Sequence, residues 1–331
     1  MFERTKICLI AALAISAVVS SFSAKIDPYF YDIILTIGIN VILAVSLNLV
    51  NGYTGQFSLG HAGFMAVGAY TAAAFTTYSS AGFLSAFKNL SQPLALEIFF
   101  AAALLTGGLA AALAGLLVGI PSLRLKGDYL AIVTLGFGEI IRVIIQNVDA
   151  VGGPRGFSVI GGYATLFWIY GLAAVTIYVI TNLVHSTYGR GFLSVRDDEI
   201  AAEAMGINTT KYKVLAFTMA AFFAGIAGGL YAHFKQYIHP EGFNFLRSFD
   251  FVVMVILGGM GNTTGVIIAA VLLTILPEGL RSVSGFGFLP DWLREIAKNR
   301  MIIYSLLLIV LMLTRPQGLF GRTESRRKAK A

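Results

Sequence analysis

Residues 33–63 read IILTIGINVILAVSLNLVNGYTGQFSLGHAG and contain no Asp, Glu, Lys or Arg. The apolar run from Ile33 to Leu49 approaches the length of about 20 residues that an α-helix needs to cross the ~30 Å hydrocarbon layer of a bilayer. Glycines at positions 52, 55, 60 and 63 follow this run directly. Because glycine weakens a helix, the stretch predicts a transmembrane helix that ends at a broken segment.

Similar apolar runs recur from one end of the chain to the other. Hydrophobic residues make up 57% of the 331 residues and charged residues only 12%, against about 25% in an ordinary soluble domain. We therefore exclude a water-soluble enzyme and expect an all-α polytopic membrane protein with about ten transmembrane helices. The candidate spans are Ile7 to Phe22, Ile33 to Leu49, Phe64 to Tyr78, Leu94 to Ile120, Tyr129 to Ile145, Leu166 to Val184, Val214 to Tyr231, Phe249 to Leu257, Val266 to Leu276 and Met301 to Leu313. The eighth and ninth are too short to cross as plain helices.

The first span has an alternative interpretation. Arg4 and Lys6 precede its apolar run, as in a cleaved signal peptide, but further spans follow at once, which favours an uncleaved helix. We expect a single transmembrane domain over residues 1–321 and a basic cytoplasmic tail over residues 322–331. The only cysteine, Cys8, permits no internal disulfide and no cysteine metal cluster, and we expect no metal site.

The net charge of +7 is an orientation signal in a membrane chain. No basic stripe interleaved with aromatics suggests nucleic-acid binding. Lys and Arg in short loops stay in the cytoplasm, which predicts that both termini are cytoplasmic. The predicted inner set is Arg4, Lys6, Arg124, Lys126, Arg190, Arg196, Lys211, Lys213, Arg315, Arg322, Arg326, Arg327, Lys328 and Lys330. The loop from Pro277 to Arg300 fits this pattern least well.

The two halves of the chain share a glycine-rich pattern. Residues 257–265 read LGGMGNTTG and, like residues 51–63, stand immediately before an apolar run. Paired glycine-broken segments indicate pseudo-symmetric halves with half-helices, and a transport pathway between them. Helix packing is the alternative role of any single glycine, and Gly115 with Gly119 and Gly225 with Gly229 have the spacing for it.

One loop, residues 185–213, is long and polar enough to leave the bilayer. Asp197 and Asp198 suit a helix start, Glu199 to Met205 are good helix formers, and Gly206 can end the helix. We predict a surface helix of about two turns that a soluble partner covers. A solvated connector is the alternative.

These segments resemble a known family. NLVNGYTGQFSLGHAGFMAVGAYTAA (48–73), GRGFLSVRDDEIAAEAMGINTTKYKVLAF (189–217), VILGGMGNTTGVIIAA (255–270) and RPQGLFG (315–321) are similar to the LivM type of branched-chain amino-acid ABC transporter permease. The resemblance implies a bacterial inner-membrane subunit that imports leucine, isoleucine or valine. The implied partners are a LivH-like second permease, LivG- and LivF-like ATPases and a periplasmic binding protein.

The ATP-hydrolysing site is absent from the sequence. No GxxxxGK[ST] motif occurs, so the chain binds no cofactor in this interpretation, and ATP and Mg²⁺ belong to the partner ATPases. The family's coupling motif, EAA followed after three residues by Gly, fits only in part, since Ile200 stands where Glu is expected. We assign docking to Arg196, Asp197, Glu199, Ala201, Ala202, Glu203, Ala204 and Gly206.

A path for such substrates needs a few polar groups between apolar walls. We predict that Gly55, Gln56, Ser58, His61, Gly258, Gly259, Asn262 and Thr263 line it. For His61 the alternative is a structural histidine bonded to a nearby backbone carbonyl. Glu139 and Arg142, three residues apart in the fifth span, are expected to neutralise each other.

Two other functions stay open at this point. The same architecture could import urea, short amides or a sugar, because related permeases handle these. A channel or secondary transporter that needs no ATP is the alternative from another class, although Glu139 alone cannot form a proton relay. A purely structural scaffold is disfavoured by the paired broken segments.

Overall fold

The computed structural model describes residues 2–21, 26–86, 91–122, 125 and 127–284, together with residues 306, 309–310, 313–314 and 318–319. These described parts are mostly helical, and they contain two short strands with two residues in each. The helices are α1 Phe2–Ser21, α2 Pro28–Asn48, α3 His61–Ala86, α4 Gln92–Ser122, α5 Asp128–Gln146, α6 Leu166–His185, α7 Thr187–Asp197, α8 Glu199–Ala204, α9 Thr209–Lys235, α10 Phe245–Gly258 and α11 Thr263–Ser284. Short turns complete them: η2 Leu49–Tyr53, η3 Asp149–Val151, η4 Gly153–Arg155 and η5 Pro240–Phe243.

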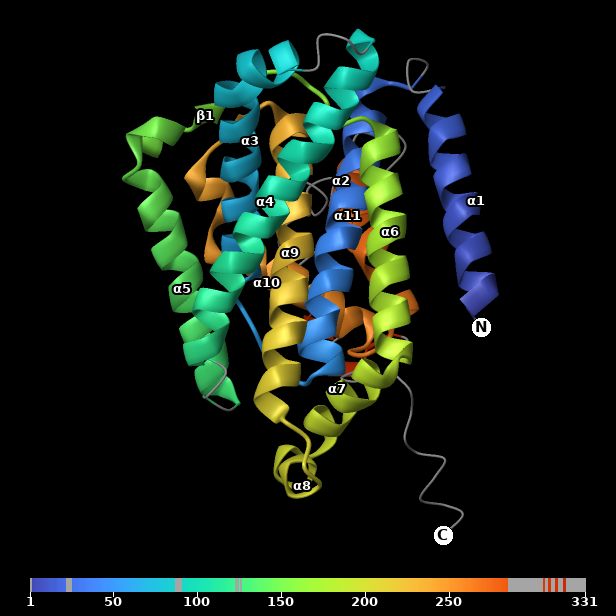
Figure 1. Cartoon of the computed structure of the whole chain (residues 1–331). Coiled ribbons are helices and arrows are strands. Elements are labelled where there is room, and N and C mark those ends of the chain that lie inside the picture. Colours follow the sequence, from blue (N-terminus) through green and yellow to red (C-terminus); the bar gives the residue numbers. More distant parts are fainter. Residues whose placement is uncertain are drawn as a thin grey trace.

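The helices form one bundle with α2 and α9 near its centre (Figure 1). Strands β1 (Phe157–Ser158) and β2 (Tyr237–Ile238) pair antiparallel near one end, and α7 and α8 lie at the other. We name these the β end and the α8 end. Helix α1 lies at the periphery against α6.

Small residues let α3, α4 and α9 pack closely. A Cβ placed on Gly68 of α3 would lie 2.2 Å from the Cα of Gly225 in α9, and one on Gly225 would lie 2.4 Å from the Cβ of Ala111 in α4. A Cβ on Gly115 would likewise lie 2.6 Å from the Cβ of Ala221. Membrane helices associate through such close backbone contacts, because lipid provides no hydrophobic force between helices. The predicted packing role of Gly115 and Gly225 is confirmed.

The chain is a multi-pass membrane protein. Five helices in the described part are long and apolar enough to cross a bilayer: Pro28–Tyr53, Gln92–Ser122, Tyr129–Gln146, Leu166–His185 and Thr209–Lys235. Nine of the ten predicted spans are helical, whereas most of the tenth, Met301 to Leu313, lies outside the described residues. Ten crossings and pseudo-symmetric halves therefore stay predictions.

Both predicted breaks interrupt the helices. Helix α2 widens into the π-turn η2. The chain is not helical from Thr54 to Gly60, and α3 follows. Helix α10 ends at Gly258, and α11 begins five residues later. At 14 residues, α10 is about 21 Å long and too short to cross, as predicted.

Helix α11 is longer than the apolar run that predicted it, although it is not among the five candidate spans. The helix has 22 residues, about 33 Å, and continues through Pro277 to polar residues beyond the apolar run. A hydropathy pattern locates only the apolar part of a helix, and the backbone of α11 stays helical beyond that part.

The loop 185–213 contains a second helix that was not predicted. Helix α7 precedes α8 and buries Phe192 and Val195 against the bundle. The side chain of Ser186 accepts a hydrogen bond from the backbone N–H of Tyr188 and caps its start. Helix α8 has six residues, close to the two turns predicted.

Candidate functional site

The two broken segments, 210 residues apart in sequence, meet at the α8 end. The side-chain oxygen of Asn48 accepts a hydrogen bond of 2.9 Å from the backbone N–H of Gly261. The hydroxyl groups of Tyr53 and Thr263 are 2.8 Å apart. A Cβ on Gly52 would lie 2.3 Å from the backbone nitrogen of Gly261, so only glycine permits this approach. The breaks therefore form one junction.

Side chains from three helices satisfy the backbone between η2 and α3. The N–H of Ser58 donates to Oδ1 of Asn51 (3.2 Å), and the N–H of Leu59 donates to the hydroxyl of Thr134 in α5 (3.0 Å). At the first turn of α3, the N–H of Ala62 donates to the hydroxyl of Ser248 in α10 (3.0 Å). Non-helical backbone at membrane depth needs such partners.

Two residues of the C-terminal motif, Gly318 and Leu319, lie against the second break. The backbone N–H of Leu319 donates to the carbonyl of Leu257, 2.7 Å away. A Cβ on Gly318 would lie 2.6 Å from the Cα of Gly259. Gly318 and Leu319 of the RPQGLFG ending thus contact the α10–α11 turn. The resemblance pointed to these residues but gave no sign of where they lie.

Arg196, near the end of α7, lies against both breaks. A Cβ on Gly55 would lie 2.8 Å from Cγ of Arg196, and one on Gly261 would lie 3.3 Å from its Nη1. Gly55 has φ of 67°, which an L side chain rarely adopts, so the chain can turn here beneath the arginine. Sequence reasoning placed Arg196 in the docking loop and Gly55 in the path, and the structure brings these two predicted sites together.

Helix α8 is fastened to the start of α9 by two carboxylates. The ammonium of Lys213 lies 2.5 Å from Oε1 of Glu199, with side chains 7% and 22% exposed. The hydroxyl of Thr209 donates to Oε1 of Glu203 at 2.7 Å. Asp198 caps the helix by accepting from the N–H groups of Ile200 and Ala201. The short helix and the central helix α9 are therefore one mechanical unit.

The outer side of α8 carries apolar side chains without cover. Ile200 is 73% exposed and Met205 82% exposed. Among the predicted docking residues, Ala201 and Ala204 lie on the exposed surface, whereas Ala202 is 5% exposed and faces inward. Glu199, a predicted docking residue, pairs with Lys213 inside the chain. Lys213 was predicted to lie on the inner side but not to take part in the site.

A partly open cavity of about 330 Å³ lies between the first break and the α7–α8 corner. Gly55 and Gln56 from the predicted path line it together with Arg196, Asp197 and Lys213. Neither side-chain polar atom of Gln56 has a hydrogen-bond partner among the described residues, although the side chain is 95% buried. An unpaired buried amide costs about 1–3 kcal/mol, so a hydrogen-bond partner for Gln56 would stabilise this segment.

The other predicted path residues lie elsewhere. Ser58 and His61 are buried, and Nε2 of His61 is 3.0 Å from the hydroxyl of Ser46, which favours a structural role with a hydroxyl partner. The side chain of Asn262 accepts from the N–H of Gly265 at the start of α11. Gly258 packs against Val266, where a Cβ would lie 2.4 Å from its Cα.

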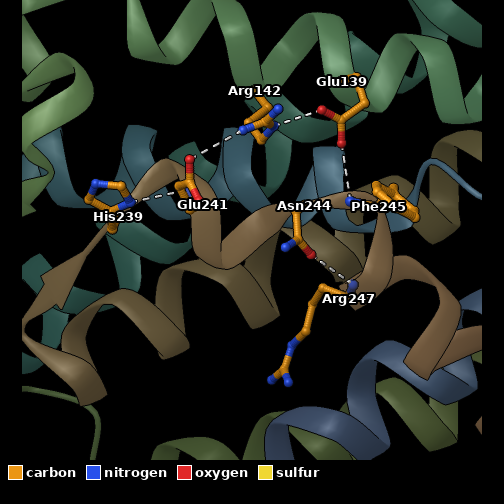
Figure 2. A network of polar contacts seen from close by, with 7 residues as sticks. All are labelled: Glu139, Arg142, His239, Glu241, Asn244, Phe245 and Arg247. Carbon is orange, nitrogen blue, oxygen red and sulfur yellow. Dashed lines mark hydrogen bonds and ion pairs between the residues drawn. The ribbon is translucent and has the colours of Figure 1, made fainter.

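A second polar cluster joins α5 to the start of α10 (Figure 2). Nε of Arg142 lies 2.7 Å from Oε2 of Glu139, which confirms the predicted pair. The other oxygen of Glu139 accepts from the N–H of Phe245 (3.1 Å), and Arg142 also lies 4.0 Å from Glu241. The structure thus adds a cap on α10 that the spacing of the pair did not indicate. In the described part, no group of three His, Cys, Asp or Glu side chains could hold a metal ion.

Comparisons with known proteins agree with this architecture. The chain is 36% identical over 259 residues to the high-affinity branched-chain amino acid transport system permease protein LivM of Salmonella typhimurium. The matched region covers 68% of this chain and 58% of that relative. It is 28% identical over 232 residues to a probable LivM permease of Methanocaldococcus jannaschii, covering 63% and 66%. It is 29% identical over 178 residues to the LivH permease of Escherichia coli, covering 53% of each chain.

The matched region therefore spans less than two thirds of the Salmonella relative's length. No solved structure matches the chain with significance. A family model described as the permease component of the branched-chain amino acid transport system matches residues 29–312, most of the chain. The predicted LivM-type resemblance is confirmed, and the chain belongs to the family of branched-chain amino acid transport permeases.

Proposed function

We propose that the chain is a permease subunit of an ABC importer that carries branched-chain amino acids inward. Membership of the family and the printed names of the relatives support this function. The subunit is non-catalytic in this proposal, and separate ATPase subunits bind ATP and Mg²⁺.

One observation carries the proposal: α8 is exposed on its outer side and tied to the membrane breaks on its inner side. Ile200 and Met205 offer an apolar surface to a soluble partner. Lys213 and Glu199 pass a displacement of α8 to α9, while Arg196 passes it to the junction of the breaks. A channel that needs no ATP would have no use for such a linkage.

In this proposal the α8 end faces the cytoplasm of a bacterial cell, and the β end faces the periplasm. Arg190, Arg196, Lys211 and Lys213 lie at the α8 end, which agrees with the positive-inside rule. Both termini are cytoplasmic. The partners are a LivH-like permease, LivG- and LivF-like ATPases and a periplasmic substrate-binding protein.

Uptake by the reconstituted transporter tests the function. With all subunits and ATP inside the vesicles, radiolabelled leucine should enter and urea should not. Uptake of urea alone would overturn the substrate, and leucine uptake that persists without the ATPases would overturn the ABC mechanism.

Binding of the ATPases tests the role of α8. The double variant Ala201→Arg with Ala204→Arg should abolish their co-purification, because two guanidinium groups replace methyls on the exposed side. Ser158→Arg at the β end is the matched control and should leave co-purification unchanged. Retained ATPase binding and uptake in the double variant would remove the docking role.

A further inference from the structure

The cavity beside the first break is large enough for one small molecule. Its volume of about 330 Å³ equals the share of roughly ten water molecules in the liquid and falls at the lower end of ligand sites, about 300–1,000 Å³. It lies between the Thr54–Phe57 segment, the first turn of α5 and the α7–α8 corner.

The walls of the cavity differ in chemistry. Phe57, Leu130 and Val195 contribute apolar side chains, and the charged lining residues are Arg196, Asp197, Asp198, Glu199 and Lys213. Asp198 caps α8 and Glu199 pairs with Lys213, so Arg196 and Asp197 are the cation and the anion that can meet a ligand. A purely anionic or cationic ligand would leave one of these charges without compensation. A zwitterion with an apolar tail matches both signs and the apolar wall, so a free amino acid is the best-fitting ligand class.

The charged pair on this wall can be exchanged at little cost. Nε and Nη2 of Arg196 both donate to one oxygen of Asp197, at 3.0 and 2.9 Å. The two side chains are 37% and 68% exposed, and exposed ion pairs contribute little stability. A ligand carboxylate can therefore take the guanidinium while a ligand ammonium takes the aspartate. The Lys213–Glu199 pair, with Lys213 almost fully buried, stays intact.

Gln56 supplies a further polar group at this cavity. It lines the cavity, is 95% buried, and leaves both its amide oxygen and its amide nitrogen without a partner among the residues that the structure describes. An amide supplies a donor and an acceptor, which are the complements of a carboxylate and an ammonium.

We propose that this cavity is a binding site for a free amino acid with an apolar side chain, occupied on the way out at the α8 end. The proposal rests on the proposed function for the identity of the solute and adds the place and the contacts. Arg196 takes the carboxylate, Asp197 the ammonium, and Phe57 with Leu130 the tail. Because each charged group exchanges one partner for another, binding is weak, which suits release.

Thiol labelling in the assembled transporter tests the site. Cys8→Ser removes the only cysteine, and Phe57→Cys then places one thiol in the cavity. Leucine at about nine times its Kd should slow labelling by a small methanethiosulfonate about tenfold. Lys211→Cys, exposed and outside the cavity, is the matched control and should label at the same rate with and without leucine.

Ligand analogues test the zwitterion. Isopentylamine lacks the carboxylate of leucine, and 4-methylpentanoate lacks its ammonium, so neither should protect the thiol. Arg196→Gln should remove protection by leucine. Equal protection by 4-methylpentanoate, or none by leucine, would overturn the site. A thiol that is blocked whenever the ATPases are bound, with or without leucine, would mean that a partner side chain fills the cavity and would also overturn it.

Equilibrium binding provides a second measurement in case the thiol fails to react. Radiolabelled leucine should bind the assembled transporter without its binding protein, and Arg196→Gln should abolish that binding; no binding to the parent would reject the site. Leucine uptake by the same preparation separates the proposals. Uptake without binding or protection refutes the site and leaves the function standing, whereas protection without uptake refutes the function.

Discussion

Replacing Lys213 by Met should release α8 from the bundle without unfolding the chain. The ammonium of Lys213 lies 2.5 Å from Glu199, and its side chain is only 7% exposed. Met has a similar length and a comparable helix propensity, so α9 itself should be unaffected. The substitution removes the ammonium that faces the carboxylate of Glu199.

The size of the effect follows from the burial of the two groups. Breaking a fully buried pair costs about 3–5 kcal/mol, but Glu199 is 22% exposed and can recover some hydration, so we expect about 2 kcal/mol. This loss should fall on α8, because six residues form a marginal helix without tertiary contacts. Two kcal/mol corresponds to a shift of about 30-fold in the opening equilibrium of α8.

Hydrogen–deuterium exchange of the permease in lipid nanodiscs measures that equilibrium. Amides of residues 202–207 should exchange about 30-fold faster in Lys213→Met, while those of 222–230 in α9 should not change. Lys211→Met removes an exposed lysine two positions away and should leave exchange unchanged. Replacing both Glu199 and Lys213 by Met should restore much of the protection, because no charge is left unpaired. Exchange in Lys213→Met within twofold of the parent would refute the tether.

Three further substitutions test other parts of the site. Gly52→Ala should lower both the thermal midpoint and leucine uptake, because the new Cβ meets the Gly261 backbone at a cost of about 1–3 kcal/mol. Gly136→Ala is the control, since a Cβ there meets open space, and it should lower neither. Asp198→Ala removes the cap of α8 at about 1 kcal/mol and should speed exchange of 202–207 about fivefold. Glu139→Gln should lower the free energy of unfolding by about 1 kcal/mol and with it the thermal midpoint. Glu241→Gln, on a 69% exposed side chain, should leave the midpoint unchanged.

The sequence was informative where one local property decides the structure. Apolar runs located nine helices, because a span must be apolar along its length. The three-residue spacing of Glu139 and Arg142 predicted their ion pair, since that spacing places both on one helix face. The glycine pattern predicted two breaks, and the structure joins them through Asn48 and Gly261.

The sequence was uninformative where distant segments share a contact. Helix α7 was missed because its glycines lower helix propensity, while burial of Phe192 and Val195 stabilises it. The polar residues Asn48 and Asn51 in an otherwise apolar stretch were the available sign of a polar junction. Nothing local indicated that Arg196 would reach both breaks, because that contact depends on how α7 packs.

The position of Arg196 bears on where a displacement of α8 would be absorbed. Helix α9 packs closely against α3 at Gly68 and Gly225, and against α4 at Gly225 and Ala111, which favours movement of these helices as one body. The break near Gly55 is also closely packed at Gly52 and Gly60, but it is not helical from Thr54 to Gly60 and it borders a cavity. The side-chain amide of Gln56 has no hydrogen-bond partner there among the described residues. We therefore infer that α9 transmits the displacement as a rigid rod while the breaks change shape, with Arg196 as their common contact.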